Sequence, residues 1–241
     1  MAPAARMRLL KLAVIWVVLL TAPYWSAPIG GYPALCSRVV ILGMAAMAFN
    51  LLLGFTGIMS FGHAAFFGLG AYGAGLALKF ATSSTILAII AGVLLGTIAG
   101  ALLGALVVRR RGVYFAMVTI AFGQIFYFIA FRWNTLTGGD DGLRGFARQP
   151  VGIGRWLLDI QHNDILFYDF VLVVLAVVAG LMGLLLQSPF GRTLLAIREN
   201  ERRARFLGIA VDLHIWLAFV ASCLFVACAG ALYACLNNFA D

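Results

Sequence analysis

The feature that most limits the fold of this chain is one long apolar stretch. From Val39 to Leu78, forty residues in all, the only readily charged side chain is His63. A helix rises about 1.5 Å per residue and the hydrocarbon core of a bilayer is about 30 Å thick, so this stretch is long enough for two membrane crossings. The sequence therefore predicts a chain that folds inside a lipid bilayer.

The composition of the whole chain agrees with this prediction. Of its 241 residues, 63% are hydrophobic and only 11% are charged, which is far from the balance of soluble globular domains. Five further apolar runs bring the expected number of passes to about seven: 9–25, 85–108, 113–131, 165–186 and 214–236. We expect an all-α, polytopic integral membrane helical bundle that forms a single transmembrane domain over residues 1–241.

The distribution of basic residues predicts how the bundle lies in the membrane. If the N-terminus is cytoplasmic, eleven of the seventeen lysines and arginines fall on the cytoplasmic side, where the positive-inside rule places them. This orientation makes 188–213 a cytoplasmic segment and 132–164 an external, periplasmic loop. The net charge of +8 indicates contact with membrane lipid, and the sequence has no basic and aromatic pattern that would indicate a nucleic-acid partner.

Four glycines recur at every fourth position of one predicted span. Residues four apart lie on one face of a helix, so this face has almost no side chains and a neighbouring helix can approach it closely. We expect a helix-packing face formed by Gly92, Gly96, Gly100 and Gly104.

A break in the forty-residue apolar stretch is the candidate for a solute pathway. Gly54, Gly57 and Gly62 interrupt the run, and irregular backbone at membrane depth is tolerated where it lines a water-filled cavity or is covered by protein. A cytoplasmic turn between two short helices explains the same pattern. The polar residues that either line a pathway or form interhelical hydrogen bonds are Asn50, Thr56, Ser60, His63, Thr119 and Gln124.

The cytoplasmic segment is the most polar part of the chain, with five arginines and two glutamates between Ser188 and Ile209. Its apolar residues form no single helical stripe, so we expect two short helices that meet near Glu199-Asn200-Glu201. Such an element can engage a groove on another protein, and a solvated loop that only sets topology is the alternative. The residues expected to contact a partner are Arg192, Arg198, Glu199, Asn200, Glu201, Arg202 and Gly208.

The sequence shows no pattern for catalysis or metal binding. The four cysteines match neither a CxxC pair nor a zinc site. Neither Lys11 nor Lys79 follows a glycine, as the lysine of a P-loop does. We therefore expect no catalytic residue, metal or cofactor in this chain. In the external loop, Thr137–Leu143 (TGGDDGL) is either a structural turn or a surface that receives a delivery protein or screens substrate.

Three blocks of the sequence resemble one family of membrane proteins. They are AFNLLLGFTGIMSFGHAAFFGLGAYGAG, YFAMVTIAFGQIFYFIAFRWNTLTGGDDGL, and SPFGRTLLAIRENERRARFLGI followed by LAFVASCLFVACAGALYA. These blocks resemble the permeases of branched-chain amino acid ABC importers of the LivM type. The resemblance implies a multi-pass permease of the bacterial inner membrane. It would pair with a second permease subunit, with ABC ATPase subunits that bind ATP and Mg²⁺, and with a periplasmic solute-binding protein.

The resemblance also assigns Arg192–Ile209 as the segment that couples the permease to its ATPase. The solutes of the family include leucine, isoleucine and valine, and relatives move urea, short amides or aromatic acids. Family members usually continue past the ALYA-like block, so we expect C-terminal helices to be missing here. The alternative function is a secondary transporter or channel without ATP coupling, for which His63 is the only candidate coupling group inside the spans.

Overall fold

The computed structural model describes residues 3–26, 30–153, 156–158, 160–161 and 163–240. Within them, six helices are long and apolar enough to cross a membrane. They are α2 (Pro33–Thr56), α3 (His63–Leu76) with its π-helical extension η2 (Ala77–Ala81), α4 (Thr85–Val107), α5 (Val113–Arg132), α7 (Asp164–Gln187) and α10 (Val211–Asn237). A further helix, α1 (Pro3–Ser26), contains the shorter apolar stretch Ala13–Trp25. The prediction of a polytopic helical membrane bundle is confirmed.

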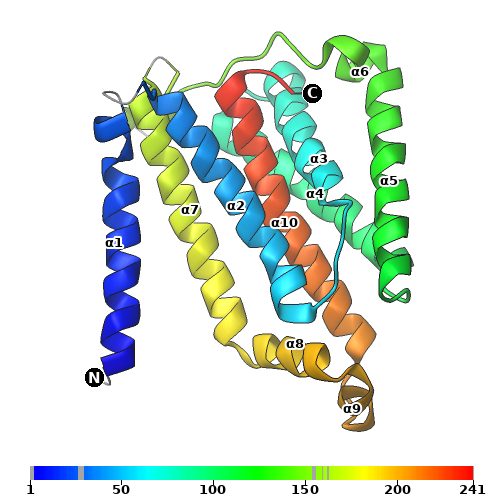
Figure 1. Ribbon diagram of the computed structural model, residues 1–241. Helices are drawn as coiled ribbons and strands as arrows, with labels where there is room; N and C mark the ends of the chain where they lie inside the picture. The colour runs from blue at the N-terminus through cyan, green and yellow to red at the C-terminus, as the bar shows by residue number, and fades with distance from the viewer. Residues whose placement is uncertain (1–2, 27–29, 154–155, 159, 162, 241) are drawn as a thin grey trace.

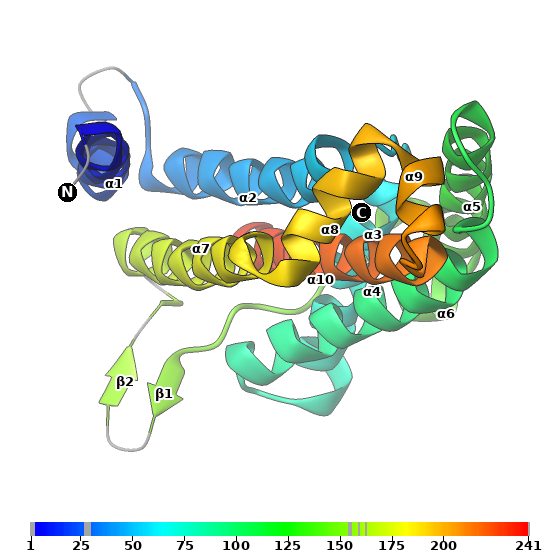
Figure 2. The ribbon, with the colours of Figure 1, turned by 90° about the horizontal axis from the view of Figure 1, so that it is seen from below.

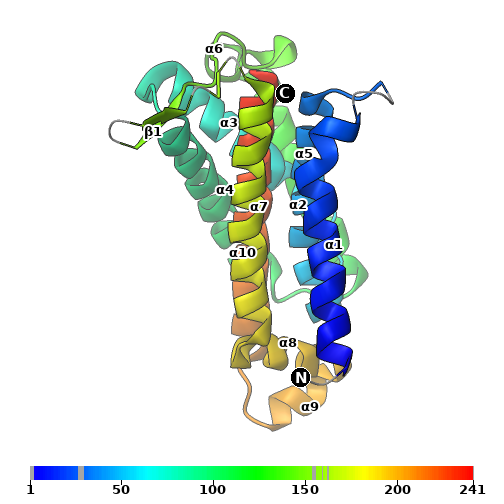
Figure 3. The same cartoon turned by 90° about the vertical axis from the view of Figure 1, so that its left-hand side faces the viewer.

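Helix α10 lies at the centre of the bundle. It is the most enclosed of the candidate spans and packs along α2, α3 and α4 (Figures 1 and 2). Helix α7 packs against α2, and α1 lies on the outside next to both (Figure 3). Helix α5 stands at the other edge of the bundle and is the least enclosed span. The core is therefore built around α10, and α1 and α5 flank it.

The two ends of the bundle carry different elements. Helices α8 (Pro189–Glu199) and α9 (Glu201–Phe206) lie across one end, where α1 also begins (Figure 1). We call this the α8–α9 end; the chain finishes at the opposite end. Arg111, in the α4–α5 connection, forms an ion pair with Glu201 of α9. The basic residues of 109–111 and 192–205 therefore share one end, as predicted, and the side of the membrane that this end faces stays a prediction.

The predicted external loop folds over the opposite end. It contains α6 (Asn134–Thr137), the 3₁₀ turn η3 (Gly139–Asp141) and an antiparallel hairpin of β1 (Val151–Ile153) and β2 (Trp156–Leu158). Positive φ angles at Gly138, Gly139 and Gly142 form its turns, which is the role that the sequence suggested for these glycines. Leu143 and Ala240 exchange backbone hydrogen bonds of 2.8 and 3.2 Å, which tie the loop to the end of α10.

A buried arginine fastens the same loop to its neighbours. Arg148 is only 6% exposed; its guanidinium pairs with Asp164 and lies 4.7 Å from the ring centre of Phe167. Its backbone N–H donates a 2.9 Å hydrogen bond to Asn238 Oδ1. Because a buried charge is tolerated only when it is paired, these contacts fix the loop against α7 and the end of α10.

Candidate functional site

The break in the apolar stretch leads from the α8–α9 end to the buried start of α3. Helix α2 ends at Thr56, where Gly57 adopts a left-handed conformation (φ 72°), and α3 begins only at His63. The segment between them, residues 57–62, runs from the α8–α9 end towards the middle of the bundle (Figure 1). Within it, the Phe61 N–H donates a 3.2 Å hydrogen bond to Thr119 Oγ1 of α5. Ser60 and Gly62 are buried, whereas Gly57, Met59 and Phe61 are exposed. Neighbouring helices therefore enclose the non-helical backbone in part, where it approaches α3.

A buried hydrogen-bond chain passes through His63. Its Nδ1 lies 2.9 Å from Ser60 Oγ, and its Nε2 lies 2.9 Å from Ser222 Oγ near the middle of α10. The single hydroxyl proton of Ser222 is donated to Ala48 O at 2.6 Å. Ser222 must therefore accept from His63, which places the proton of a neutral ring on Nε2 and makes Nδ1 the acceptor of the Ser60 hydroxyl. We call these four groups the His63 network.

Aromatic rings enclose the same imidazole. Phe49, Phe66 and Phe219 meet it edge-on, with ring centres 5.3, 6.1 and 5.7 Å away. Both ring nitrogens are occupied and the faces are covered, so His63 braces α2, α3 and α10 in the structure. Sequence reasoning missed Ser222, and its one signal was a lone serine in the apolar run 214–236.

The structure separates the other predicted pathway residues. Thr56 donates to Leu52 O of its own helix at 2.5 Å, and Thr119 donates to Ala116 O at 2.8 Å. Asn50 is exposed on α2, with its side chain next to Gly54. Gln124 is exposed on α5. The structure therefore brings Ser60, His63 and, through Phe61, Thr119 together, whereas Asn50 and Gln124 lie elsewhere.

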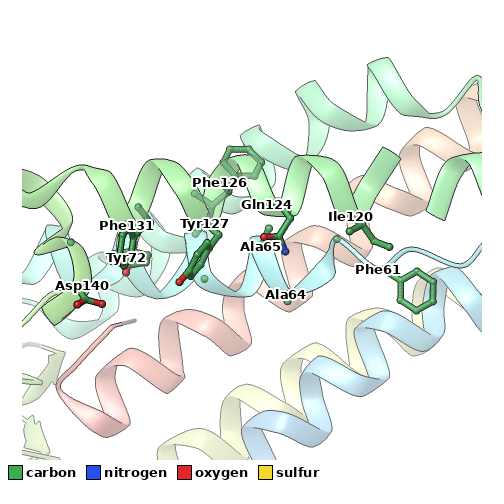
Figure 4. Close-up of a pocket in the computed structure, with 16 residues that line it drawn as sticks. Phe61, Ala64, Ala65, Tyr72, Ile120, Gln124, Phe126, Tyr127, Phe131 and Asp140 are labelled. Carbon is green, nitrogen blue, oxygen red and sulfur yellow. The ribbon is translucent and has the colours of Figure 1, made fainter. Parts of the chain in front are cut away.

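Gln124 lines a groove of about 500 Å³ between α3 and α5, which has the volume of a small-molecule site. Asp140, Tyr72 and Phe131 lie at one end of this groove and Phe61 at the other (Figure 4). Gln124 lies between them (Figure 4). Small residues of α3, of α5 and of the segment before α3 complete its wall: Gly62, Ala64, Ala65, Gly68, Gly123 and Ala130. We call this space the α3–α5 groove.

The four glycines of α4 face α3 and α10. A Cβ atom at Gly100 would lie 2.6 Å from the Cβ of Cys223, and one at Gly104 would lie 2.9 Å from Phe219. A Cβ at Gly92 or Gly96 would meet backbone atoms of α3 and the Cβ of an α10 alanine. The α10 residues that face these glycines also recur at every fourth position: Phe219, Cys223, Ala227 and Ala231. The helices approach each other this closely because the glycines have no side chains.

At the α8–α9 end, the predicted pair of short helices is confirmed. Helix α8 buries Leu194 and Ile197 against the bundle and ends at Glu199. Asn200 then caps α9, because its Oδ1 accepts a 2.9 Å hydrogen bond from the Arg203 N–H. After α9, Gly208 adopts φ 81°, and the N–H groups of Gly208 and Ile209 bond back to Arg205 and Ala204. This Schellman ending stops the helix at Gly208.

Four charged side chains fix α9 to the bundle. Arg111 donates to both carboxylate oxygens of Glu201 at 3.0 and 3.1 Å and also pairs with Asp212 at the start of α10. Arg205 pairs with Glu201 and Asp212, each at 2.9 Å. The hydrogen bonds of Arg205 raise the pKa of its guanidinium, and the bond to Glu201 has the largest effect. The Glu201–Arg205 pair follows from helical spacing, whereas Arg111 and Asp212 were not predicted as its partners.

The remaining predicted coupling residues divide into two groups. Arg198 donates a hydrogen bond to Gly54 O, one of the last carbonyls of α2, so it links α8 to the end of α2. The others are exposed: Arg192, Glu199, Asn200, Arg202 and Gly208. Sequence reasoning did not single out Phe206 and Leu207, which are 84% and 74% exposed at the end of α9. Together they form an apolar tip on a braced, basic element.

The family model described as branched-chain amino acid transport system / permease component matches residues 33–241. The chain belongs to this permease family. Two similar curated proteins are both described as high-affinity branched-chain amino acid transport system permease protein LivM, one from Escherichia coli (strain K12) and one from Salmonella typhimurium (strain LT2). The permease is 27% identical to each, over 96% and 97% of its own length, and spans 57% of theirs. No solved structure matches it significantly.

Proposed function

We propose that this chain is the membrane-spanning permease subunit of an ATP-driven ABC importer in a bacterial inner membrane. Its cargo would be a branched-chain amino acid or a related small polar solute. A second permease subunit, ABC ATPase subunits and a periplasmic solute-binding protein would complete the assembly, and the ATPase would bind ATP and Mg²⁺. Family membership supports this proposal, and the observation that carries it is the exposed apolar tip of α9.

The α8–α9 element has the properties of a docking site for a motor subunit. The Arg111–Glu201–Arg205–Asp212 cluster holds α9 at the base of α10, while Phe206 and Leu207 project away from the bundle. Large exposed apolar side chains surrounded by charge are typical of protein interfaces. A rigid base below an exposed tip would let a partner that grips the tip move the helices behind it.

A contact route leads from this element to the α3–α5 groove. Arg198 of α8 bonds to the end of α2 and lies against Gly57, where the break begins. The break continues to Phe61 and Gly62, which line the groove. We propose that movement of α8 driven by the ATPase shifts this segment and opens the groove towards the α8–α9 end.

Replacing the apolar tip tests the docking site. We expect the double variant Phe206→Ser/Leu207→Ser to lose co-purification with the cognate ABC ATPase, because these side chains supply apolar contact area without supporting the fold. The measurement is the ATPase to permease ratio after affinity purification in mild detergent. Phe80→Ser is the matched control, since Phe80 is 66% exposed at the opposite end. Equal ATPase retention by the tip variant and the wild type would refute the docking site.

Replacing Arg198 tests the route from α8 to α2. We expect Arg198→Ala to keep the ATPase bound and active but to lower the solute moved per ATP hydrolysed, because the contact with Gly54 O is lost. Coupling between sites usually corresponds to about a 5- to 150-fold effect, so a drop of at least about fivefold is expected. Thr193→Ala on the same helix is the control, since among the described residues the Thr193 hydroxyl bonds to Pro189 O of α8 alone. An unchanged transport to hydrolysis ratio in Arg198→Ala would contradict the route.

A further inference from the structure

The α3–α5 groove is unevenly polar along its length. At the end of the bundle away from α8 and α9, the rim of the groove carries the carboxylate of Asp140. Most of the groove wall consists of aromatic rings and small residues. Asp140 forms no ion pair with a basic side chain in the described part of the chain. An exposed carboxylate beside apolar surface attracts a cation that also carries apolar groups.

The apolar wall is suited to a small hydrophobic side chain. Tyr72, Tyr127 and Phe131 lie along the groove next to the rim (Figure 4). On the α3 side, one turn before Tyr72, the wall leaves open space at Gly68: a Cβ atom built there would meet no described atom outside its own stretch of helix within 4 Å. Aromatic and small residues that together leave open space form an apolar slot beside the carboxylate.

A second polar group lies deeper in the groove. Gln124 is exposed and forms no hydrogen bond within the described residues, so its amide is available as both donor and acceptor. Gln124 and Phe131 are seven positions apart on α5, which is about 10 Å along a helix. A small solute would therefore meet Asp140 and Gln124 one after the other.

The geometry points to the α3–α5 groove as the solute site of this permease, with Asp140 as the group that selects a solute carrying a positively charged amine beside an apolar side chain. This inference rests on the proposed function and narrows it. It favours zwitterionic amino acids with apolar side chains over urea, neutral amides and carboxylic acids without an amine. At the rim the amine would pair with the Asp140 carboxylate while the side chain occupies the slot beside Gly68. Gln124 would contact the polar groups of the solute at a later position, once the solute has moved further in.

The first test measures occupancy of the groove without any need for ATP. The reporter is a Gly68→Cys variant of the full chain in native membrane vesicles, alkylated with N-ethylmaleimide, on a Cys36→Ala background because the other three cysteines are buried. The probes are L-leucine and 4-methylpentanoate, which has the same carbon skeleton without the amine. We expect leucine to slow alkylation and 4-methylpentanoate to have no effect.

The selectivity for the amine is tested by a matched pair of variants. Loss of a charge-assisted hydrogen bond changes binding by about tenfold, so Asp140→Asn should raise the half-protecting concentration of leucine by about that factor. Asp141→Asn makes the same charge change one residue away but does not line the groove, and protection should be unchanged. Equal protection by the two probes, or equal effects of the two variants, would overturn the role of Asp140.

A blocked groove gives the second test. Gly68→Leu should abolish ATP-dependent leucine uptake, because its side chain fills the slot, whereas Gly180→Leu on the exposed face of α7 should not. Normal uptake by Gly68→Leu, or failure of leucine to protect the reporter, would refute the groove as the solute site and leave the importer proposal standing. Protection by leucine without any ATP-dependent uptake in the wild type would instead retain the site and reject the ATP-driven function.

Discussion

A leucine at Gly100 is expected to prevent the helical bundle from assembling. The Cβ alone would lie 2.6 Å from Cys223 Cβ and 2.8 Å from its Sγ, so α4 and α10 would have to separate before the rest of the side chain could fit. Helices in a bilayer associate through close packing, and lipid readily replaces a poorly fitting partner helix. Overpacking commonly costs about 1–3 kcal/mol or more, and here both backbones would have to move.

The measurement is the yield of monodisperse protein after extraction in mild detergent. We expect Gly100→Leu to lose most of it. Gly180→Leu should keep the wild-type yield, because a Cβ at Gly180 would meet no described atom outside its own stretch of helix within 4 Å. An exchange variant tests the cause directly. Gly100→Ala should lower the yield, and adding Cys223→Gly to the same chain should partly restore the yield, because the glycine then lies on α10 instead of α4. A wild-type yield for Gly100→Leu would contradict the close approach of α4 and α10.

The glycine face shows which parts of this fold can be predicted from sequence. A repeat of four residues is a local pattern, and it identifies the face of α4 that needs a close neighbour, but it does not say which helix that neighbour is. The neighbours are α10 and α3, and the α10 contact depends on a matching four-residue repeat more than a hundred positions away, in which Cys223, Ala227 and Ala231 are small. The spans themselves were located for the same local reason, since about 20 apolar residues are required for each crossing.

The polar contacts inside the bundle were predictable only in part. Ser60 and His63 lie three residues apart, so their proximity follows from the sequence, whereas Ser222 and Ala48 join them from α10 and α2. Likewise Glu201 and Arg205 are spaced to pair on a helix, and Arg111 joins them from another connection. Polar residue types therefore indicated where hydrogen bonds were needed, and tertiary packing decided the partners.

The groove was predicted least well, for a related reason. All six residues proposed for the pathway are polar, and five of them do not line the groove. The groove wall consists mainly of aromatic rings, glycines and alanines. Such residues are common in every membrane span and carry no distinct signal in one sequence. Only Gln124 belongs to both sets. A cavity is a property of two helix surfaces that do not fit, and it cannot be read from either helix alone.

Removing the imidazole of His63 is expected to destabilise the bundle strongly. His63→Ala would leave a cavity between Phe49, Phe66 and Phe219 and remove one hydrogen bond each from Ser60 and Ser222. Truncation of a buried ring costs about 3–5 kcal/mol, of which most is packing. His63→Phe should lose less, because it keeps the ring volume and sacrifices only the hydrogen bonds, which average about 0.6 kcal/mol in membrane proteins. The measurement is thermal stability in detergent, in which the wild type should be the most stable, His63→Phe intermediate and His63→Ala the least stable.

The same position separates an ATP-driven importer from a proton-coupled transporter. His63→Gln carries no titratable group, but its amide can still donate to Ser222. If ATP drives transport, uptake per folded protein should stay close to that of the wild type, because His63 only braces α2, α3 and α10. A transporter that moves protons through this ring would lose uptake even where the amount of folded protein is normal. Such a loss in His63→Gln, with normal stability, would reject the structural role of His63 and favour proton coupling over the ATPase.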